Sequence, residues 1–193
     1  MNLVRNYVTP NDVGVMADTD SRSINNAVSE AVESGVRRVV IPRINERTGD
    51  VFGLHVTNIH VRTNTAVMLN ESVENSYFGN IYAANGVDRV ISTKSCRARQ
   101  NSGAELKNVV FENIFYDCRD NANSTAFDFD TNNREHTMKN VIIRNAFIGK
   151  AECAVNMKHK GSLNISGLYS DLPSPSVTVS AGAEVIIDGK KYE

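Results

Sequence analysis

One phrase recurs along this chain from about residue 55 to its end, and this repetition constrains the fold more than any other feature. In each copy an Asn leads a β-branched run, an irregular stretch follows, and a second short alternating run comes after it. The aligned leading residues are Asn58, Asn75, Asn108, Asn140 and Asn164. They lie a few tens of residues apart, a period typical of solenoids and other stacked repeats. The repetition therefore predicts an elongated fold built from similar coils.

Each copy supplies two runs with strand character, rich in Val and Ile and separated by turn residues. Such runs, without helical periodicity, predict an all-β parallel solenoid whose coils each contain two or three strands. In the register that the runs suggest, Met68 and Ile91 face outward, which would indicate a covered surface. The first runs span 56–61, 73–81, 106–114, 138–146 and 163–168, and the second runs span 65–70, 88–93, 125–130, 153–158 and 175–180.

The recurrent Asn has two interpretations. Asn tolerates the left-handed backbone region, its amide bonds to local backbone, and stacked copies can form a ladder of side chains. The alternative is a line of surface amides that bind sugar hydroxyls. Both interpretations place Asn at the same point of every coil.

Composition and charge bound the class of protein. The 21 Lys and Arg nearly balance 22 Asp and Glu, for a formal net charge of −1, so neither nucleic acid nor an anionic membrane is an expected partner. No stretch reaches the roughly 20 apolar residues of a membrane span, and the N-terminus has no leader pattern. We therefore expect a cytoplasmic protein, or a secreted one if a leader has been removed. The three cysteines are widely spaced and lack a CxxC motif, so we expect them reduced.

The N-terminal third has a different pattern. Between Ser21 and Gly35, apolar residues such as Ile24 and Val28 recur at helical spacing, and a β-branched run over Val36–Arg43 follows. A parallel solenoid needs its open end covered, because exposed core and free strand edges invite association. The sequence predicts one domain over 1–193, with a capping helix and first strand in about 1–50 and stacked coils in about 51–193.

Two segments together carry a family resemblance. The segment D-T-D-S-R-S-I-N-N-A-V (Asp18–Val28), which precedes V-V-I-P-R (Val39–Arg43), and coils of the type K-N-V-V-F-E-N-I (Lys107–Ile114) resemble the pectin-lyase-like right-handed parallel β-helix superfamily. The chain is most similar there to bacterial polygalacturonase-like glycoside hydrolases. The resemblance covers nearly the whole chain and implies a right-handed β-helix that acts on a polysaccharide or oligosaccharide.

The resemblance leaves the activity open. Polygalacturonase-like hydrolases carry N-T-D, D-D, H-G and R-I-K on successive coils, and this series is missing here. The chain is also shorter than members of the family. Three interpretations remain: a glycoside hydrolase, a non-catalytic glycan-binding module such as a shortened hydrolase relative or a tailspike-like adhesin, and a structural β-helix that forms homo-oligomers, either dimers or trimers.

A candidate catalytic pair lies in the run TAFDFD. Strict alternation turns Phe127 and Phe129 inward and puts Asp128 and Asp130 together on the outer face. Two residues along a strand are separated by roughly 6.5 to 7 Å, near the carboxyl separation of inverting glycoside hydrolases. One carboxyl could then protonate the leaving oxygen while the other activates water. The alternative is an ordinary solvated sheet face.

The neighbouring run CAVNMK completes the candidate site. In-register stacking sets Asn156 beside Asp128 and Lys158 beside Asp130. Lys158 either contacts a substrate carboxylate or forms a simple ion pair with Asp130. His136 and His159 flank the same coils and are candidate substrate contacts, since imidazole titrates near neutrality. No spaced ligand loop accompanies the acidic residues, so we predict neither a metal nor a cofactor.

Overall fold

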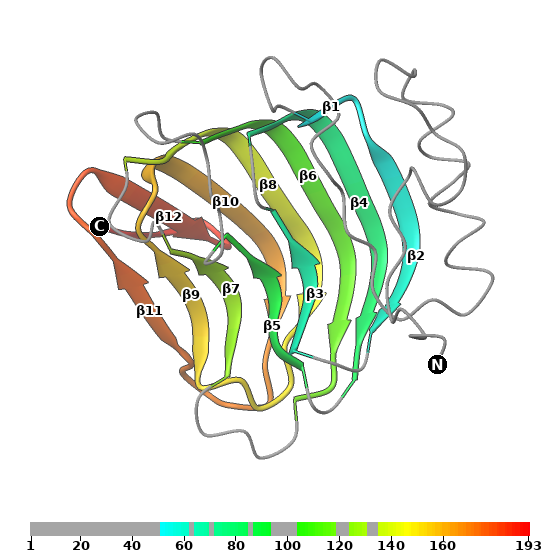
Figure 1. Cartoon of the computed structure of the whole chain (residues 1–193). Helices are drawn as coiled ribbons and strands as arrows, with labels where there is room; N and C mark the ends of the chain where they lie inside the picture. Colours follow the sequence, from blue (N-terminus) through cyan, green and yellow to red (C-terminus); the bar gives the residue numbers. More distant parts are fainter. Residues whose placement is uncertain are drawn as a thin grey trace, which may run out of the picture.

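The structure, a computed structural model, describes residues 51–61, 64–69, 72–84, 87–93, 104–118, 124–130 and 135–193. The elements within these ranges are all β-strands (Figure 1). The helix expected over 21–35 and the strand expected over 36–43 lie outside the described residues. What the structure describes is therefore the stacked part of the predicted fold.

Long and short strands alternate along the chain and separate into two sheets. The first sheet holds β1 (Val51–Phe52), β2 (His55–Val61), β4 (Val73–Ala83), β6 (Glu105–Tyr116), β8 (Thr137–Phe147), β10 (Lys160–Tyr169), β12 (Ala183–Ile187) and β13 (Lys190–Tyr192). The second sheet holds β3 (Asn64–Met68), β5 (Val87–Ser92), β7 (Thr125–Phe129), β9 (Cys153–Met157) and β11 (Ser176–Val179). The paired runs of the sequence are thus confirmed as strands of a parallel β-solenoid.

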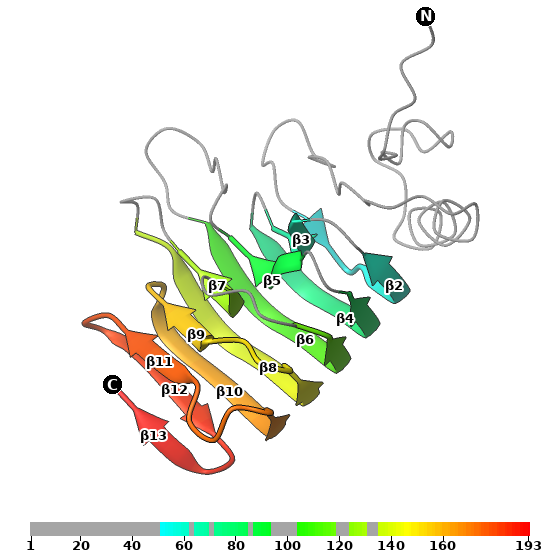
Figure 2. The ribbon, with the colours of Figure 1, turned by 90° about the horizontal axis from the view of Figure 1, so that it is seen from below.

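Successive coils stack in chain order and in register. Strand β6 pairs in parallel with β4 on one side and with β8 on the other, and Figure 2 shows this order from β2 to β13. The register aligns Ile81 with Ile114 and Ile114 with Ala146. Equivalent positions of successive coils therefore form columns, and each column is either inside the solenoid or on its surface.

The core lies between the two sheets. Phe78 and Phe111, from neighbouring coils, stack with ring centroids 5.2 Å apart and are almost fully buried. On the second sheet, Ile91 pairs with Phe127 and belongs to the same buried cluster. The expectation that Ile91 faces outward is therefore wrong, because its column is the inward one. The side chain of Met68 lies outside the described part of the structure.

The long strands bend at asparagines with left-handed backbone. A positive φ normally costs about 1–2 kcal/mol for a residue with a Cβ, and Asn tolerates it best after Gly. Two such columns run through the first sheet, and their side-chain amides bond from coil to coil. One column contains Asn58, Asn80, Asn113 and Asn145, and the other contains Asn75, Asn108 and Asn140.

The predicted ladder is confirmed, but the alignment of its members changes. Asn58 pairs across the sheet with the position of Asn80 rather than Asn75, because each full coil carries an Asn at both bends. Asn164 aligns with Ile142 within a regular strand and belongs to neither column. Gly167, with a φ of 68°, follows Asn145 and continues the left-handed column without a side chain.

The last two strands of the chain form a hairpin and not a further coil. After β12 the chain turns back at Asp188 and Gly189, both with positive φ, and β13 pairs with β12 antiparallel. Two successive positive φ values are what a tight hairpin turn requires. The returning strand carries Lys190 and Lys191, charges that make an exposed sheet edge a poor template for pairing.

Candidate functional site

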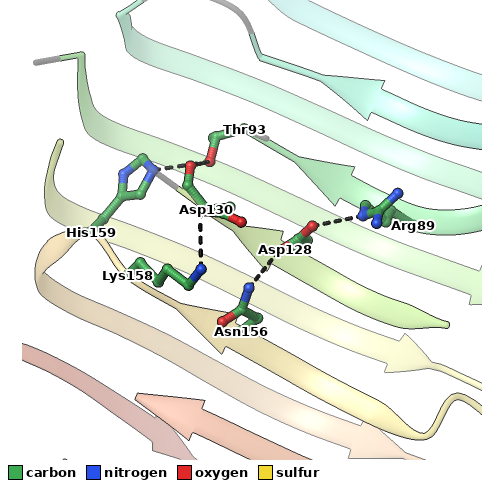
Figure 3. A network of polar contacts seen from close by, with 7 residues as sticks. All are labelled: Arg89, Thr93, Asp128, Asp130, Asn156, Lys158 and His159. Atoms are coloured by element: carbon green, nitrogen blue, oxygen red, sulfur yellow. Dashed lines mark hydrogen bonds and ion pairs between the residues drawn. The ribbon is translucent and has the colours of Figure 1, made fainter. Parts of the chain in front are cut away.

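The two predicted catalytic carboxylates lie where alternation placed them. Phe127 and Phe129 are completely buried in the core, while Asp128 and Asp130 project toward the neighbouring strands β5 and β9 (Figure 3). Asp128 is nevertheless only 4% exposed, and Ser92, its neighbour on β5, is buried as well. The middle of this face is therefore not a solvated surface.

Asp128 is held by both neighbouring coils. Its Oδ2 accepts a hydrogen bond from Nε of Arg89 at 2.6 Å, and its Oδ1 accepts one from Nδ2 of Asn156 at 2.7 Å. Figure 3 shows the three side chains in a row across β5, β7 and β9. The expected pairing with Asn156 is confirmed, and Arg89 is a partner that the sequence reasoning missed. Both carboxylate oxygens accept a hydrogen bond, and the one from the Arg89 guanidinium is charge-assisted.

Asp130 forms the second cross-coil contact. Nζ of Lys158 lies 3.2 Å from its Oδ1, as expected from the stacking of CAVNMK on TAFDFD. Lys158 is exposed and Asp130 is half-buried, so solvent screens this pair more than the Arg89 pair. The main-chain carbonyl of Asp130 also accepts a hydrogen bond from Oγ1 of Thr93. This end of the row is the more accessible one.

The two candidate histidines lie inside the solenoid. His136 and His159 are each 0% exposed, with ring centroids 5.0 Å apart. Nε2 of His159 lies 2.9 Å from Oγ1 of Thr93, whereas Nδ1 of His136 accepts a hydrogen bond from the main-chain N–H of Ala104. Figure 3 shows His159 beside Thr93 and Asp130, and the complete burial of both histidines keeps their rings away from the outer surface.

Burial dominates the electrostatics of this corner. Removal from water, and next the charge that His136 can carry, lower the pKa of His159 from 6.5 to about 4. A neutral imidazole at physiological pH is the consequence. It can accept or donate a hydrogen bond inside the protein, and its burial keeps it away from a ligand on the outer face.

This geometry favours structural contacts over acid and base chemistry. A general acid must hold a proton and deliver it to a bound ligand, and a base must be within hydrogen-bond reach of the proton that it removes. Asp128 meets neither requirement, since both of its oxygens are engaged with Arg89 and Asn156 and it is nearly inaccessible. Asp130 is the carboxylate of the pair with more access to solvent.

No metal or membrane feature occurs in the described ranges. Within them, no group of three His, Cys, Asp or Glu side chains is arranged to hold a metal ion. None of the described residues form a helix that is long and apolar enough to cross a membrane.

A different surface feature lies at the end of the long strands. An aromatic side chain stands two residues after each Asn of the second bend, and the rings of the three middle coils stack. Tyr82 and Phe115 have parallel rings with centroids 5.3 Å apart, and the next pair along the column is 5.0 Å apart. Four rings of this set are exposed: Tyr82 at 37%, Phe115 at 43%, Tyr169 at 66%, and His60 as well. We call this set the aromatic column; its members are His60, Tyr82, Phe115, Phe147 and Tyr169.

The aromatic column was missed although its signal is in the sequence. The triplets N-I-H, N-I-Y, N-I-F, N-A-F and G-L-Y end in a ring each time. In the three middle coils the ring always follows the first Asn by seven residues, but Asn58 and Asn164 occupy other positions of their coils, so alignment on the first Asn puts His60 and Tyr169 out of line. Alignment on the second Asn would have brought the rings into one column.

Comparison of the chain with protein-family models, with curated proteins and with solved structures finds no match.

Proposed function

We propose that this chain is a right-handed β-solenoid of the pectin-lyase-like type that binds an extended glycan without cleaving it. The observation that carries the proposal is the aromatic column beside the exposed amides of Asn58, Asn80, Asn113 and Asn145. Exposed apolar surface rimmed by polar groups marks binding sites. A sugar offers both C–H groups for rings and hydroxyls for amides.

The amides of this ladder keep hydrogen-bonding capacity. In Asn113, one N–H donates to Asn80 and the carbonyl oxygen accepts from Asn145. A carboxamide has two N–H donors and two acceptor lone pairs, so half of its capacity is left for a ligand. The ladder therefore orients the amides and leaves groups on each that can bond to sugar hydroxyls.

The aromatic rings contribute apolar contact at a regular spacing. The rings of Tyr82, Phe115 and Phe147 are stacked on each other, so this part of the column presents mainly ring edges. Tyr169 lies at the end of the column and is 66% exposed. A glycan lying along the column would contact the ring edges and place one sugar against the face of Tyr169.

The proposal is tested by measuring the affinity of the protein for a panel of glycans by calorimetry. The panel contains polygalacturonate and uncharged plant and bacterial polysaccharides. The Tyr82→Ser, Phe115→Ser double variant is expected to bind at least about tenfold more weakly, since stacked aromatic contacts contribute about 0.5–1.5 kcal/mol each. Lys139→Ser is the matched control, because Lys139 is an exposed long side chain on β8 outside the column. Equal affinity of both variants and the unaltered protein for every bound glycan would refute the column as the site.

Hydrolysis is the second candidate, because Asp128 and Asp130 share one face with Asn156 and Lys158 opposite them. In that case Asp130 would be the carboxylate that meets substrate and Lys158 its uronate contact. Hydrolysis would be supported in place of binding if the protein releases reducing sugar from a glycan of this panel and the Asp128→Asn, Asp130→Asn double variant does not. Release from no substrate, together with no glycan binding, would favour a structural role with self-association, which size exclusion with light scattering detects.

A further inference from the structure

Two of the four histidines of the chain are buried next to each other, and two lie exposed on the outside. His136 immediately precedes Thr137, the first residue of β8, and His159 immediately precedes Lys160, the first residue of β10. Their rings are tilted by 33° with centroids 5.0 Å apart and are shielded completely from solvent. Buried imidazoles at this separation cannot both be charged without a large cost.

The hydrogen bond of His136 fixes its proton. The main-chain N–H of Ala104, one coil earlier, lies 2.7 Å from Nδ1. A main-chain N–H can only donate, so Nδ1 must carry a lone pair and the ring proton is on Nε2. A proton added at Nδ1 would set two N–H groups against each other and break the bond to Ala104.

The contacts of Thr93 fix the proton of His159. Oγ1 of Thr93 lies 2.8 Å from the carbonyl oxygen of Asp130 and 2.9 Å from Nε2 of His159. The hydroxyl has one proton, and the carbonyl can only accept, so the hydroxyl donates to Asp130 and Nε2–H of His159 donates to Thr93. Nδ1 of His159 therefore carries the lone pair, and this atom has no hydrogen-bond partner among the described residues.

The described charged residues around His136 and His159 form ion pairs with each other. Lys158, beside His159, binds Asp130, and Lys160 binds Glu135 at 2.8 Å. Phe129 covers His159 edge-on, with centroids 5.9 Å apart. Both described carboxylates that flank the pair already have an ammonium partner, and the attraction of Asp130 for a charged His159 is outweighed by burial and by His136.

We propose that His136 and His159 form an acid-operated latch that holds three successive coils together at this corner while both rings are neutral. The coils are those that end in Thr93, Asp130 and His159. When a proton from solvent adds to Nδ1 of either ring, the bond to Ala104 or the apolar packing around His159 is lost and the corner opens. The main-chain carbonyl of Asp130 is one of the latch contacts. Opening of the corner at acidic pH therefore also loosens the outer face on which the side chain of Asp130 lies.

Hydrogen exchange at the main-chain amide of Ala104 tests the latch. We expect its protection, corrected for intrinsic exchange, to fall on acidification by about tenfold per pH unit for each proton that opening takes up. The His136→Gln and His159→Gln variants should each take up one proton fewer on opening, because Gln is not protonated in this pH range. The protection of Ala104 should therefore depend less steeply on pH in each variant. His55→Gln and His60→Gln, on the exposed outer face, should leave it unchanged. A wild-type protection that does not vary between pH 7 and pH 4 would overturn the proposal.

A second measurement needs no substitution. Long-range ¹⁵N–¹H spectra of the imidazoles report which nitrogen carries the proton. We expect Nε2–H tautomers for both buried rings at pH 7, and protonation only together with the loss of Ala104 protection. Protonation of either buried ring while the amide of Ala104 is still protected would show that the pair is not a latch.

Discussion

Nε of Arg89 lies 2.6 Å from Oδ2 of Asp128 and joins the second and third short strands across the outer face of the solenoid. The carboxylate is nearly inaccessible, while the guanidinium is partly exposed. A charge held in this way depends on its partners, because solvent cannot replace them. The pair explains why a carboxylate that the sequence marks as catalytic belongs to the cross-coil contacts.

Loss of the Asp128 charge should therefore destabilise the fold. We expect Asp128→Asn to lower the free energy of unfolding by about 1–3 kcal/mol, since Arg89 loses a charged acceptor at a mostly buried position. Asp130→Asn is the control, because its pair with the exposed Lys158 should contribute less than about 1 kcal/mol. Urea denaturation of both variants gives the comparison, and a larger loss for Asp130→Asn would contradict the assignment.

The left-handed bends predict a second pair of variants. Asn113 has a φ of 55°, so Asn113→Ala should lose about 1–2 kcal/mol from backbone strain in addition to its ladder bonds. Asn113→Gly loses the same bonds without the strain and should be the more stable of the two. Asn164→Ala, in regular strand geometry, should change stability little. Thermal unfolding ranks the three, and an Ala variant as stable as the Gly variant would refute the strain.

Gly79 leaves room for the ring of Tyr77, whose Oη donates to Oε2 of Glu112 at 2.8 Å. A Cβ at position 79 would lie 2.5 Å from this hydroxyl oxygen, so Gly79→Ala should displace the ring. The hydrogen bond to Glu112, followed by burial, raises the pKa of Tyr77 above its ordinary 10.0. We expect this pKa to fall back toward the ordinary value in the Gly79→Ala variant.

Ultraviolet titration of the tyrosinate measures the effect, with Tyr77→Phe identifying its contribution to the spectrum. Glu112→Gln should lower the pKa of Tyr77 as Gly79→Ala does, and the double variant should add little to either. Additive effects of the two substitutions would mean that Gly79 acts through something other than this bond.

The buried His159 predicts how stability depends on pH. Its folded-state pKa of about 4 lies below the ordinary 6.5, so the unfolded chain binds more protons between these values. The contribution of His159 to the free energy of unfolding should be fully present above pH 6.5. It should decrease as the pH drops toward 4, by about 3 kcal/mol at most. Denaturant unfolding at several pH values checks this sign. His159→Gln should flatten the curve in that window, and an unchanged slope in this variant would assign the acid sensitivity elsewhere.

Much of the fold could be predicted because it depends on residues that are close together in the sequence. The strand runs, the inward turn of Phe127 and Phe129, and the contacts of Asp128 with Asn156 and of Asp130 with Lys158 follow from alternation and in-register stacking. Two features did not follow. Arg89 and Asp128 are 39 residues apart, and their contact depends on where the intervening chain re-enters the second sheet. The burial of His136 and His159 depends on how the turns close at each corner.

The sequence by itself determined the repeating strands, the left-handed Asn bends and the alternation of inward and outward side chains, because each depends on neighbouring residues and a period of two. Only the tertiary structure decided which columns line up and which of their members water can reach. The exposed stack of Tyr82 and Phe115 was not predicted from the sequence. Asp128, predicted to lie on the outer face, is nearly inaccessible to water. Register between coils and closure of the corners set these outcomes, and both arise from contacts between residues far apart in the chain.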